Sequence, residues 1–472
     1  MTSTGSGRAR LIAVFLIVMS LAFGSPAEAI SLREAVQVAL EANPEIGQAI
    51  ANREATQFEL RQARGLYLPQ VDLEGRYGAQ TFDSPGTRFS GTSDDVLARK
   101  EANLTLSQLI FNGFGRRGAV EEQAARVDAA SHRVFERSEL IGLGIVREYL
   151  EFGRLGRIIQ LAEENLRYHR KILADVKKGA EEGTLSVADS QLAQERVYSA
   201  EAQLTLARED RNAAAISFYR LIGIPLDSYE GAPLPPDSLP GSLENGIAIA
   251  RQNSPVIQVA AAELDAAYGV RKQANSELYP KLSLELRGRH GDDLDGVFGR
   301  ETDLRAEMVM RWNLYRGGID IANKQAALRR IDEQRFRLDQ AYRDVEETMR
   351  LAWNRRVQEA QRLGQLESSL SQLNLLVDSY QEQFKIGERT LLDLLNTQNN
   401  KFNTQVAVET ARFAVLFADY GVLAAAGGLL ATLHLVPPAQ AAVYARDAVG
   451  SPLTPEAETQ KRFSPWEPRQ TP

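Results

Sequence analysis

The chain has no cysteine among its 472 residues, and it has only four histidines. Without thiols it cannot form disulfides, thiolate metal sites, a cysteine nucleophile or a lipid-modified N-terminal cysteine. The histidines are scattered and lack the spacing of metal ligands. Its 55 basic and 62 acidic side chains give a net charge of -7, which argues against nucleic acid as a partner because such binding usually requires a basic patch. No enzyme, metal or cofactor is therefore expected.

Proline is missing from two long stretches, between Pro85 and Pro225 and between Pro280 and Pro437. An interior proline costs a helix about 3 kcal/mol, so stretches of about 140 and 156 residues without one are what very long helices require. Prolines instead cluster in the middle of the chain and in the last 36 residues, which contain seven of them. This distribution predicts long helices rather than several compact domains.

The N-terminal segment, residues 1–29, reads as a secretory signal peptide. Two arginines precede an apolar run, residues 11–23, and the sequence Ala27-Glu28-Ala29 follows as a cleavage site. The run is shorter than the ~20 residues that span a bilayer as a helix, although an uncleaved anchor is the alternative. We expect a mature chain that begins near Ile30 and leaves the cytoplasm.

The rest of the chain contains an internal repeat. At an offset of 211 residues, Ser31-Leu32 matches Ser242-Leu243, and Pro44 and Pro69 match Pro255 and Pro280; a shorter loop in the second copy then changes the offset to 204, at which Gly183 matches Gly387 and Asp189 matches Asp393. The expected organisation is a first repeat over residues 30–230, a proline-rich linker over 231–241, a second repeat over 242–430 and a flexible proline-rich tail over 431–472.

Each repeat begins with two predicted helices and continues with two predicted strands. Ser31 and Glu34 have the spacing of a capping box, and Pro44 or Pro255 suits the first turn of the next helix. Beyond Pro69 and Pro280 polar and apolar residues alternate strictly, as they do again near residues 103–107 and 308–313. Such alternation fits a half-buried sheet in a soluble protein as well as strands of a membrane barrel.

Two long helices are predicted next in each repeat, residues 116–182 and 319–386. Apolar residues recur there at spacings of three and four, which is the seam of a left-handed coiled coil. Gly183 and Gly387 end these helices, and Ser186 and Thr390 begin returning helices that run to about residues 222 and 426. The last apolar stretch, residues 413–436, is interrupted by Asp419 and is interpreted as packed helix rather than a membrane span.

Residues 113–118 read Gly-Phe-Gly-Arg-Arg-Gly, which matches a dinucleotide-binding fingerprint formally. The preceding strand alternates and the following helix is too long for a nucleotide-binding unit. A tight turn from strand to helix is the preferred interpretation of these glycines.

Together these residues resemble the TolC family of trimeric outer-membrane channel-tunnels, over about residues 30 to 430. The resemblance rests on the duplicated order helix, strand, strand, helix, helix, on Phe111-Asn112-Gly113 and Tyr315-Arg316-Gly317-Gly318 before the long helices, and on an aspartate six residues after Gly183 and Gly387. It implies a mainly α fold with a small β part, in which three copies each give four strands to a 12-stranded barrel and coiled-coil hairpins extend a tunnel through the periplasm. Four strands alone cannot close a barrel, so a homotrimer is expected.

The resemblance also assigns the strand faces. The residues expected to face outer-membrane lipid are Val71, Leu73, Leu104, Leu106, Leu282, Leu284, Met308, Met310 and Trp312. Those expected to line the lumen are Asp72, Glu74, Arg76, Glu285, Arg287 and Arg311.

At the other end of the tunnel the resemblance implies a gate. Asp393 matches an acidic position of the pore constriction; Asn396 stands where a second acidic residue is usual, so the ring should carry half the charge. Arg389 and Asp189 match a latch between neighbouring hairpins, and Phe384 replaces a tyrosine of that network. Capping of a helix N-terminus is the simpler role for Asp393.

The turns Gly183-Thr184 and Gly387-Glu388 are expected to dock a periplasmic adaptor, with a plain hairpin connection as the alternative. The implied function is a passive exit duct that works with this adaptor and an inner-membrane transporter, either of the ABC type or driven by protons. Resemblance around residues 147–150 and 162–173 favours type I protein secretion over small-molecule efflux. Alternatives from other classes are a soluble periplasmic adaptor and a filamentous scaffold.

Overall fold

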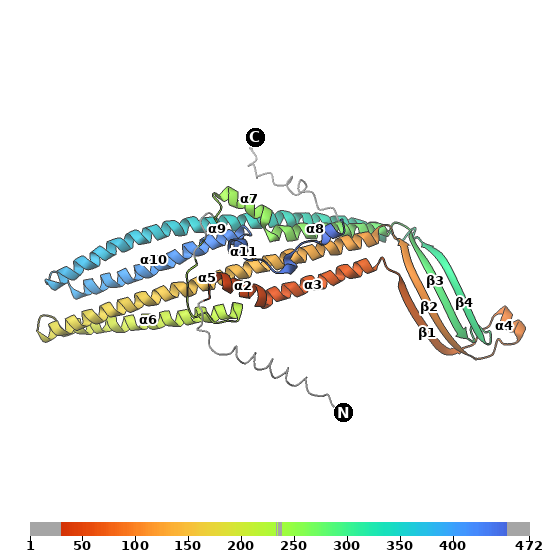
Figure 1. Cartoon of the computed structure of the whole chain (residues 1–472), viewed down its shortest axis with the longest axis horizontal. Helices are drawn as coiled ribbons and strands as arrows, with labels where there is room; N and C mark the ends of the chain where they lie inside the picture. Colours follow the sequence, from red (N-terminus) through yellow and green to blue (C-terminus); the bar gives the residue numbers. More distant parts are fainter. Residues whose placement is uncertain (1–29, 233, 235–237, 451–472) are drawn as a thin grey trace, which may run out of the picture.

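The computed structural model describes residues 30–232, 234 and 238–450. The expected signal peptide, residues 1–29, lies outside the described residues. Figure 1 shows a long bundle of helices that carries a sheet at one end.

From residue 30 to the linker, the described part of the chain contains five helices and two strands: α2 (Leu32–Ala42), α3 (Pro44–Gly65), β1 (Gln70–Gln80), α4 (Pro85–Ser90), β2 (Leu97–Phe111), α5 (Gly115–Glu181) and α6 (Val187–Ile222). The second half repeats this order without α4: α7 (Leu243–Asn253), α8 (Pro255–Ser276), β3 (Lys281–Asp292), β4 (Arg300–Arg311), α9 (Ile319–Lys385) and α10 (Leu391–Ala425). Three short helical segments follow, α11 (Leu429–Thr432), η1 (Ala439–Ala441) and α12 (Ala445–Ala448). Ser31 forms the expected capping box with Glu34.

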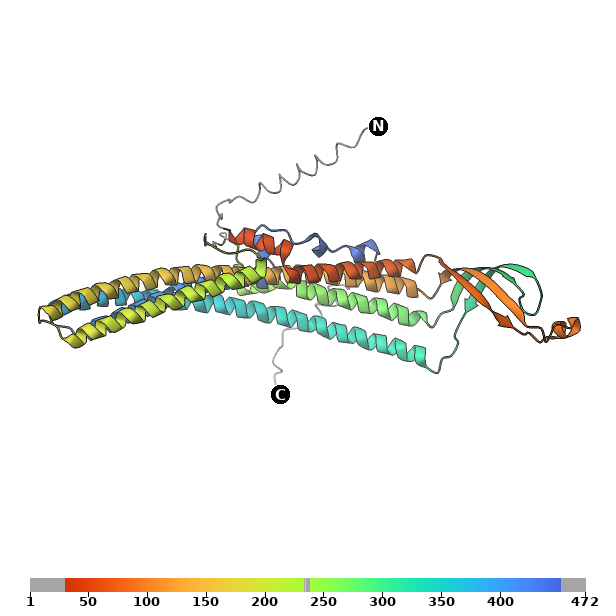
Figure 2. The ribbon, with the colours of Figure 1, turned by 90° about the horizontal axis from the view of Figure 1, so that it is seen from below.

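The two longest helices determine the shape of the molecule. Helices α5 and α9 have 67 residues each, which corresponds to ~100 Å at 1.5 Å per residue. Helix α6 covers the half of α5 that leads to the hairpin turn, and α3 covers the half next to the sheet. In the same way, α10 covers the half of α9 that leads to the hairpin turn, and α8 covers the half next to the sheet. The molecule is therefore a rod with helix turns at one end and strands at the other (Figure 2).

The principal core lies near the middle of the rod, where α2, α5, α6 and α10 meet. Tyr149 and Phe218 are fully buried there beside Tyr420, Leu429 and Leu430. The Tyr149 hydroxyl donates to the Ile30 carbonyl and accepts from the Glu230 amide, both at 3.2 Å. A chain so elongated thus keeps a compact, hydrogen-bonded core at its centre.

Glycines bring α5 and α8 into close contact. A Cβ placed on Gly118 would lie 2.7 Å from the Gly269 carbonyl oxygen, and one on Gly269 would lie 2.7 Å from the Gly118 carbonyl oxygen. Gly113 has a φ of +62°, and a Cβ placed on it would lie 2.7 Å from Tyr279 Cβ. The glycines of residues 113–118 therefore permit the tight turn from strand to helix, as predicted. They also permit the close contact between the two repeats, which was not predicted.

The C-terminal segment differs from the expected flexible tail. Residues 439–448 pack along α3 and α5. The Asp128 carboxylate of α5 accepts hydrogen bonds from the amides of Tyr444, Ala445 and Arg446. The Arg446 guanidinium joins Asp128 at 2.8 Å to Asp265 of α8 at 2.7 Å, and all three side chains are buried. The expectation of flexibility is wrong for this part because distant carboxylates fix it; residues 451–472 lie outside the described residues.

The apolar stretch at 413–436 packs within the protein. Asp419, which interrupts it, accepts a hydrogen bond from Arg356 Nε at 2.7 Å. Over the described ranges, no helix combines the length and the apolarity needed to cross a membrane.

Glu139 is a buried acid in the core and gives a pH prediction. Burial raises the pKa of its carboxyl to about 7, although hydrogen bonds from the Leu430 and Leu429 amides act in the opposite direction. In the unfolded chain this group ionises near its ordinary pKa of 4.5. Between these two values the unfolded state loses its proton while the folded state keeps it, so the contribution of Glu139 to stability falls as pH rises.

We therefore expect the free energy of unfolding of the wild type to fall relative to that of Glu139→Gln as pH rises from about 5 to 8. Chemical unfolding at several pH values measures this difference. A difference that stays constant across the range would contradict the prediction.

Candidate channel surface and hairpin tips

The four strands form one antiparallel sheet in the order β1-β2-β3-β4. The central pair, β2 and β3, joins the two repeats through a register that pairs Leu104 with Gly288 and Leu106 with Leu286. Strands β1 and β4 are the edges, each hydrogen-bonded on one side within this chain. The sheet is therefore open at both edges.

One face of the sheet is apolar and exposed. Register places eight of the expected apolar residues on this face: Val71, Leu73, Leu104, Leu106, Leu282, Leu284, Met308 and Met310. Leu73 is 76% exposed and Met308 is 65% exposed. Trp312 follows the end of β4, is exposed, and donates from its indole Nε1 to the Leu278 carbonyl at 3.2 Å. Such an exposed apolar surface requires a cover, because large apolar patches on soluble monomers are rare.

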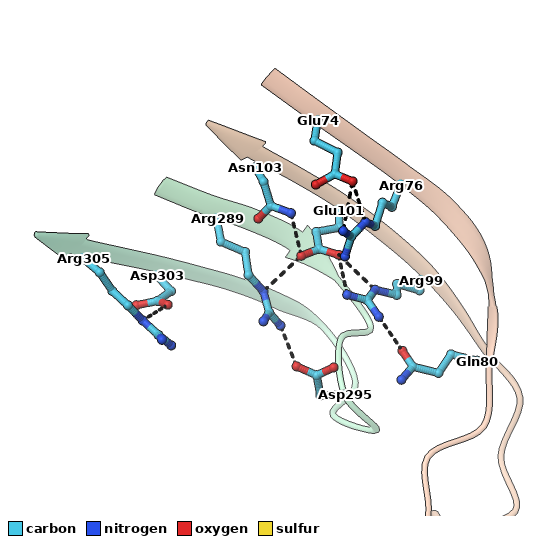
Figure 3. Close-up of polar contacts among 10 residues, drawn as sticks. All are labelled: Glu74, Arg76, Gln80, Arg99, Glu101, Asn103, Arg289, Asp295, Asp303 and Arg305. Carbon is cyan, nitrogen blue, oxygen red and sulfur yellow. Dashed lines mark hydrogen bonds and ion pairs between the residues drawn. The ribbon is translucent and has the colours of Figure 1, made fainter. Parts of the chain in front are cut away.

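The opposite face is polar and is organised around a buried carboxylate. Glu101 of β2 has a side chain only 3% exposed and lies among Arg76, Arg99 and Arg289 from three different strands (Figure 3). The Asn103 side-chain amide donates to Glu101 Oε1 at 2.9 Å. On the same face, Arg311 pairs with Glu285 at 2.8 Å and Arg305 pairs with Asp303 at 2.6 Å. Acidic and basic side chains thus neutralise one another along this face.

Both helix hairpins turn at a glycine with a left-handed backbone. Gly183 has a φ of +75° and Gly387 a φ of +78°, conformations that an L side chain rarely adopts. The Thr184 amide donates to the Gly179 carbonyl at 2.8 Å, and the Glu388 amide donates to the Gln383 carbonyl at 2.9 Å. These bonds satisfy the last carbonyls of the long helices, and the two turns lie together at one end of the rod (Figure 1).

Asp393 caps α10. Its backbone amide donates to Thr390 Oγ1 at 3.2 Å, and its carboxylate accepts from the same hydroxyl at 2.9 Å. The Asp393 side chain is 44% exposed, so this hydrogen bond with Thr390 leaves it accessible to solutes. Asn396, one turn further on, accepts a hydrogen bond from Arg196 of α6 at 3.3 Å.

The residues expected to form the latch bind their own hairpins within one copy. Asp189 accepts from the Ser186 amide at 3.0 Å and the Ser186 hydroxyl at 2.7 Å. The Arg389 guanidinium lies 4.3 Å from the centre of the Tyr380 ring and 3.9 Å from the Asp393 carboxylate. Phe384 packs against the apolar cluster that contains Leu391 and Leu394.

Sequence reasoning missed the centre of the polar face. Glu101 and Arg99 precede the stretch where alternation was recognised, because β2 begins at Leu97. Arg289 and Asp295 were also missed, although continuing the alternation of β3 would have placed Arg289 on the same face as Arg287. Arg196 gave no signal, since a lone arginine on a polar helix face is ordinary.

A family model described as "Outer membrane efflux protein" matches residues 35–224 and 246–428. The chain therefore belongs to the outer membrane efflux protein family, whose members are channels of the outer membrane that extend into the periplasm. The family consists of conduits, not enzymes.

Two curated relatives and one solved structure illustrate the similarity. The outer membrane efflux protein BepC of Brucella suis is 24% identical over 370 residues, which is 78% of this chain and 79% of BepC. The alkaline protease secretion protein AprF of Pseudomonas aeruginosa is 24% identical over 421 residues, 86% of each chain. The crystal structure of the outer membrane protein VceC of Vibrio cholerae has a TM-score of 0.72 at 17% identity and covers 84% of this chain and 96% of VceC. The fold is thus that of an outer-membrane channel protein.

Proposed function

We propose that three copies of this chain assemble into one exit duct, each giving its four strands to a twelve-stranded barrel. The observation that carries this proposal is the sheet itself, which is open along β1 and β4 and exposes an apolar face. In a bilayer every strand edge must be paired, so an open four-stranded sheet is not viable there. Pairing of β1 from one copy with β4 from the next closes the edges of all three copies.

In this assembly the apolar face lies against lipid and the polar face lines the lumen. The set that contains Leu73, Met308 and Trp312 then contacts the hydrocarbon region, and the charged set around Glu101 and Arg287 contacts water. Alternation of this kind over strands of 11 to 15 residues is long enough to cross a bilayer when the strands tilt. A soluble adaptor or a scaffold would not need an exposed apolar sheet.

For the cargo we propose protein, exported by type I secretion. The support is the similarity to AprF over 86% of both chains, because that relative is named as an alkaline protease secretion protein. Small-molecule efflux is the alternative, supported by the similarity to BepC. Residues 147–150 and 162–173 are weaker support for protein as the cargo. Tyr149, Leu150 and Asn165 are buried, so the resemblance there reflects packing of the helices more than the lining of the lumen.

A trimer that resists detergent tests the duct. We expect an outer-membrane extract to give a trimer band on an unheated gel and a monomer band after heating. Recovery of all the protein from the soluble periplasmic fraction would refute the duct. Deletion of the gene should then abolish secretion of a protein substrate without changing drug susceptibility, whereas the reverse result supports efflux.

We further propose that the turns Gly183-Thr184 and Gly387-Glu388 dock a periplasmic adaptor that couples the duct to an inner-membrane transporter. Asp393, in the first turn of α10 and partly exposed, supplies the acidic ring at the tunnel entrance. Asn396 supplies no charge and is held by Arg196. This entrance therefore carries one carboxylate per copy at these two positions.

Arg389 is proposed to contact Asp189 of a neighbouring copy and so to hold the tips together. Arg389→Ala should leave a trimer with a larger single-channel conductance, because an exposed pair contributes at most about 1 kcal/mol and its loss frees the tips without unfolding them. Planar bilayer recording measures the conductance. Lys385→Ala is a matched control, since Lys385 pairs with Glu382 on the same hairpin; equal conductance for the two variants would remove the latch assignment.

A further inference from the structure

The connection between β3 and β4, residues 293–299, folds back over the polar face of the sheet. Arg289 points from that face, since register pairs it with Asn103, and its Nη2 donates to Asp295 Oδ2 in the connection at 2.7 Å. Leu294 is only 1% exposed. A Cβ on Gly291 would lie 3.0 Å from Leu294 Cδ1, so this leucine packs directly against the sheet.

The connection has a closed base. The Asp293 amide donates to the Gly299 carbonyl, and the Gly299 amide donates to Asp293 Oδ1, both at 2.9 Å. Within this loop, Gly296 has a φ of +81°. The segment is therefore a defined turn with its own hydrogen bonds.

The β1–β2 connection supports this turn from the other side. A Cβ on Gly296 would lie 2.5 Å from Thr87 Cγ2 and 3.2 Å from Phe82 Cδ1. Thr87 is buried, and Ser84 and Thr87 form a capping box at the start of α4. The two connections thus pack together as one unit, and it ends in exposed aromatic rings, with Phe89 96% exposed and Phe298 60% exposed.

This unit lies at the end of the sheet farthest from the helices (Figure 1). Because the helices extend into the periplasm, that end faces the outside of the cell. We infer that residues 293–299, supported by α4, form a lid that narrows the outlet of the duct at the cell surface, and that the Arg289–Asp295 pair pins it. This inference rests on the proposed function, because the polar face borders a lumen only in the trimer.

The Arg289–Asp295 ion pair is weak enough to let the lid open. The Asp295 side chain is 45% exposed and Arg289 is 22% exposed, and partly exposed pairs are weak and screened by salt. Glu101 also approaches Arg289, at 3.6 Å, so the guanidinium keeps a partner on the sheet when the loop leaves. The lid can therefore open without leaving Arg289 unpaired. It acts in series with the constriction at the hairpin tips.

The absence of cysteine permits a direct test on intact cells. A membrane-impermeant maleimide reports exposure of Leu294→Cys, which the closed lid buries. Adding Asp295→Asn should make labelling up to about fivefold faster, as loss of one exposed ion pair allows. Asp303→Asn is the matched control because it removes the same charge from the same face, where Asp303 pairs with Arg305, and it should leave the rate unchanged.

Phe298→Cys serves as an exposed reference, and it should label rapidly in every background. If the labelling rate of Leu294→Cys is the same with and without Asp295→Asn, the inference of a lid is wrong. As a second measurement, Asp295→Asn without any cysteine should show a higher conductance than Asp303→Asn in planar bilayers. Failure of the wild type to form channels would instead count against the proposed function, so the two failures can be distinguished.

Discussion

Arg446→Met is expected to lower the free energy of unfolding by about 3–5 kcal/mol, because it removes the cation that lies between two buried carboxylates. The Arg446 guanidinium is 9% exposed, and the carboxylates of Asp128 and Asp265 are 1% and 4% exposed. Methionine fills similar volume but cannot neutralise either carboxylate. Denaturant unfolding of the detergent-solubilised protein, and trimer retention on unheated gels, measure the loss.

Arg329→Met is the control for this substitution. Arg329 also pairs with an aspartate, Asp332 at 3.1 Å, but its side chain is 81% exposed, so the cost should stay below about 1 kcal/mol. Adding Asp265→Asn to Arg446→Met should recover part of the loss, because it removes one of the charges that the guanidinium neutralised. Equal stability of Arg446→Met and Arg329→Met would show that the network contributes little.

Leu73→Arg is expected to cost about 2–4 kcal/mol per copy if Leu73 faces the middle of the bilayer, and less nearer its surfaces. The side chain is 76% exposed on the apolar face, so the substitution has space but would place a cation in hydrocarbon. The expected result is a large loss of trimer from the outer membrane, measured by fractionation and unheated gels.

Asp72→Arg provides the comparison because Asp72 is the preceding residue of β1 and projects from the polar face. There the new guanidinium meets water and should change stability by less than about 0.5 kcal/mol. If both variants assemble equally well, the assignment of the two faces is wrong.

Local sequence signals located the helix ends because each depends on chemistry within a few residues. Ser31 with Glu34, and Thr390 with Asp393, form their caps as expected. Gly183 and Gly387 turn the hairpins because only a residue without Cβ adopts a positive φ cheaply. The strand faces were also predictable, since alternation with a period of two is a property of the strand itself.

Contacts between distant segments were not predictable in this way. The C-terminal segment looked flexible from its prolines, yet Arg446 binds carboxylates 318 and 181 residues away. The second coiled-coil seam matched the first in sequence, but Leu363, Leu366 and Leu370 are only partly buried, whereas Leu166 and Val176 of the first seam are buried. Periodicity gives the face of a helix but not how completely a neighbour covers it.

The sequence alone therefore determined the order of the long helices and the strands, the helix caps and hairpin turns, and which face of each strand is apolar, because these follow from backbone and neighbour chemistry. Tertiary structure decided what no local pattern encodes. It paired β2 with β3 so that Glu101 meets arginines from three strands, folded residues 293–299 over the polar face, and clamped the C-terminal segment onto both repeats. Each depends on charges and apolar side chains brought together from distant parts of the chain, so only the folded chain could assign them.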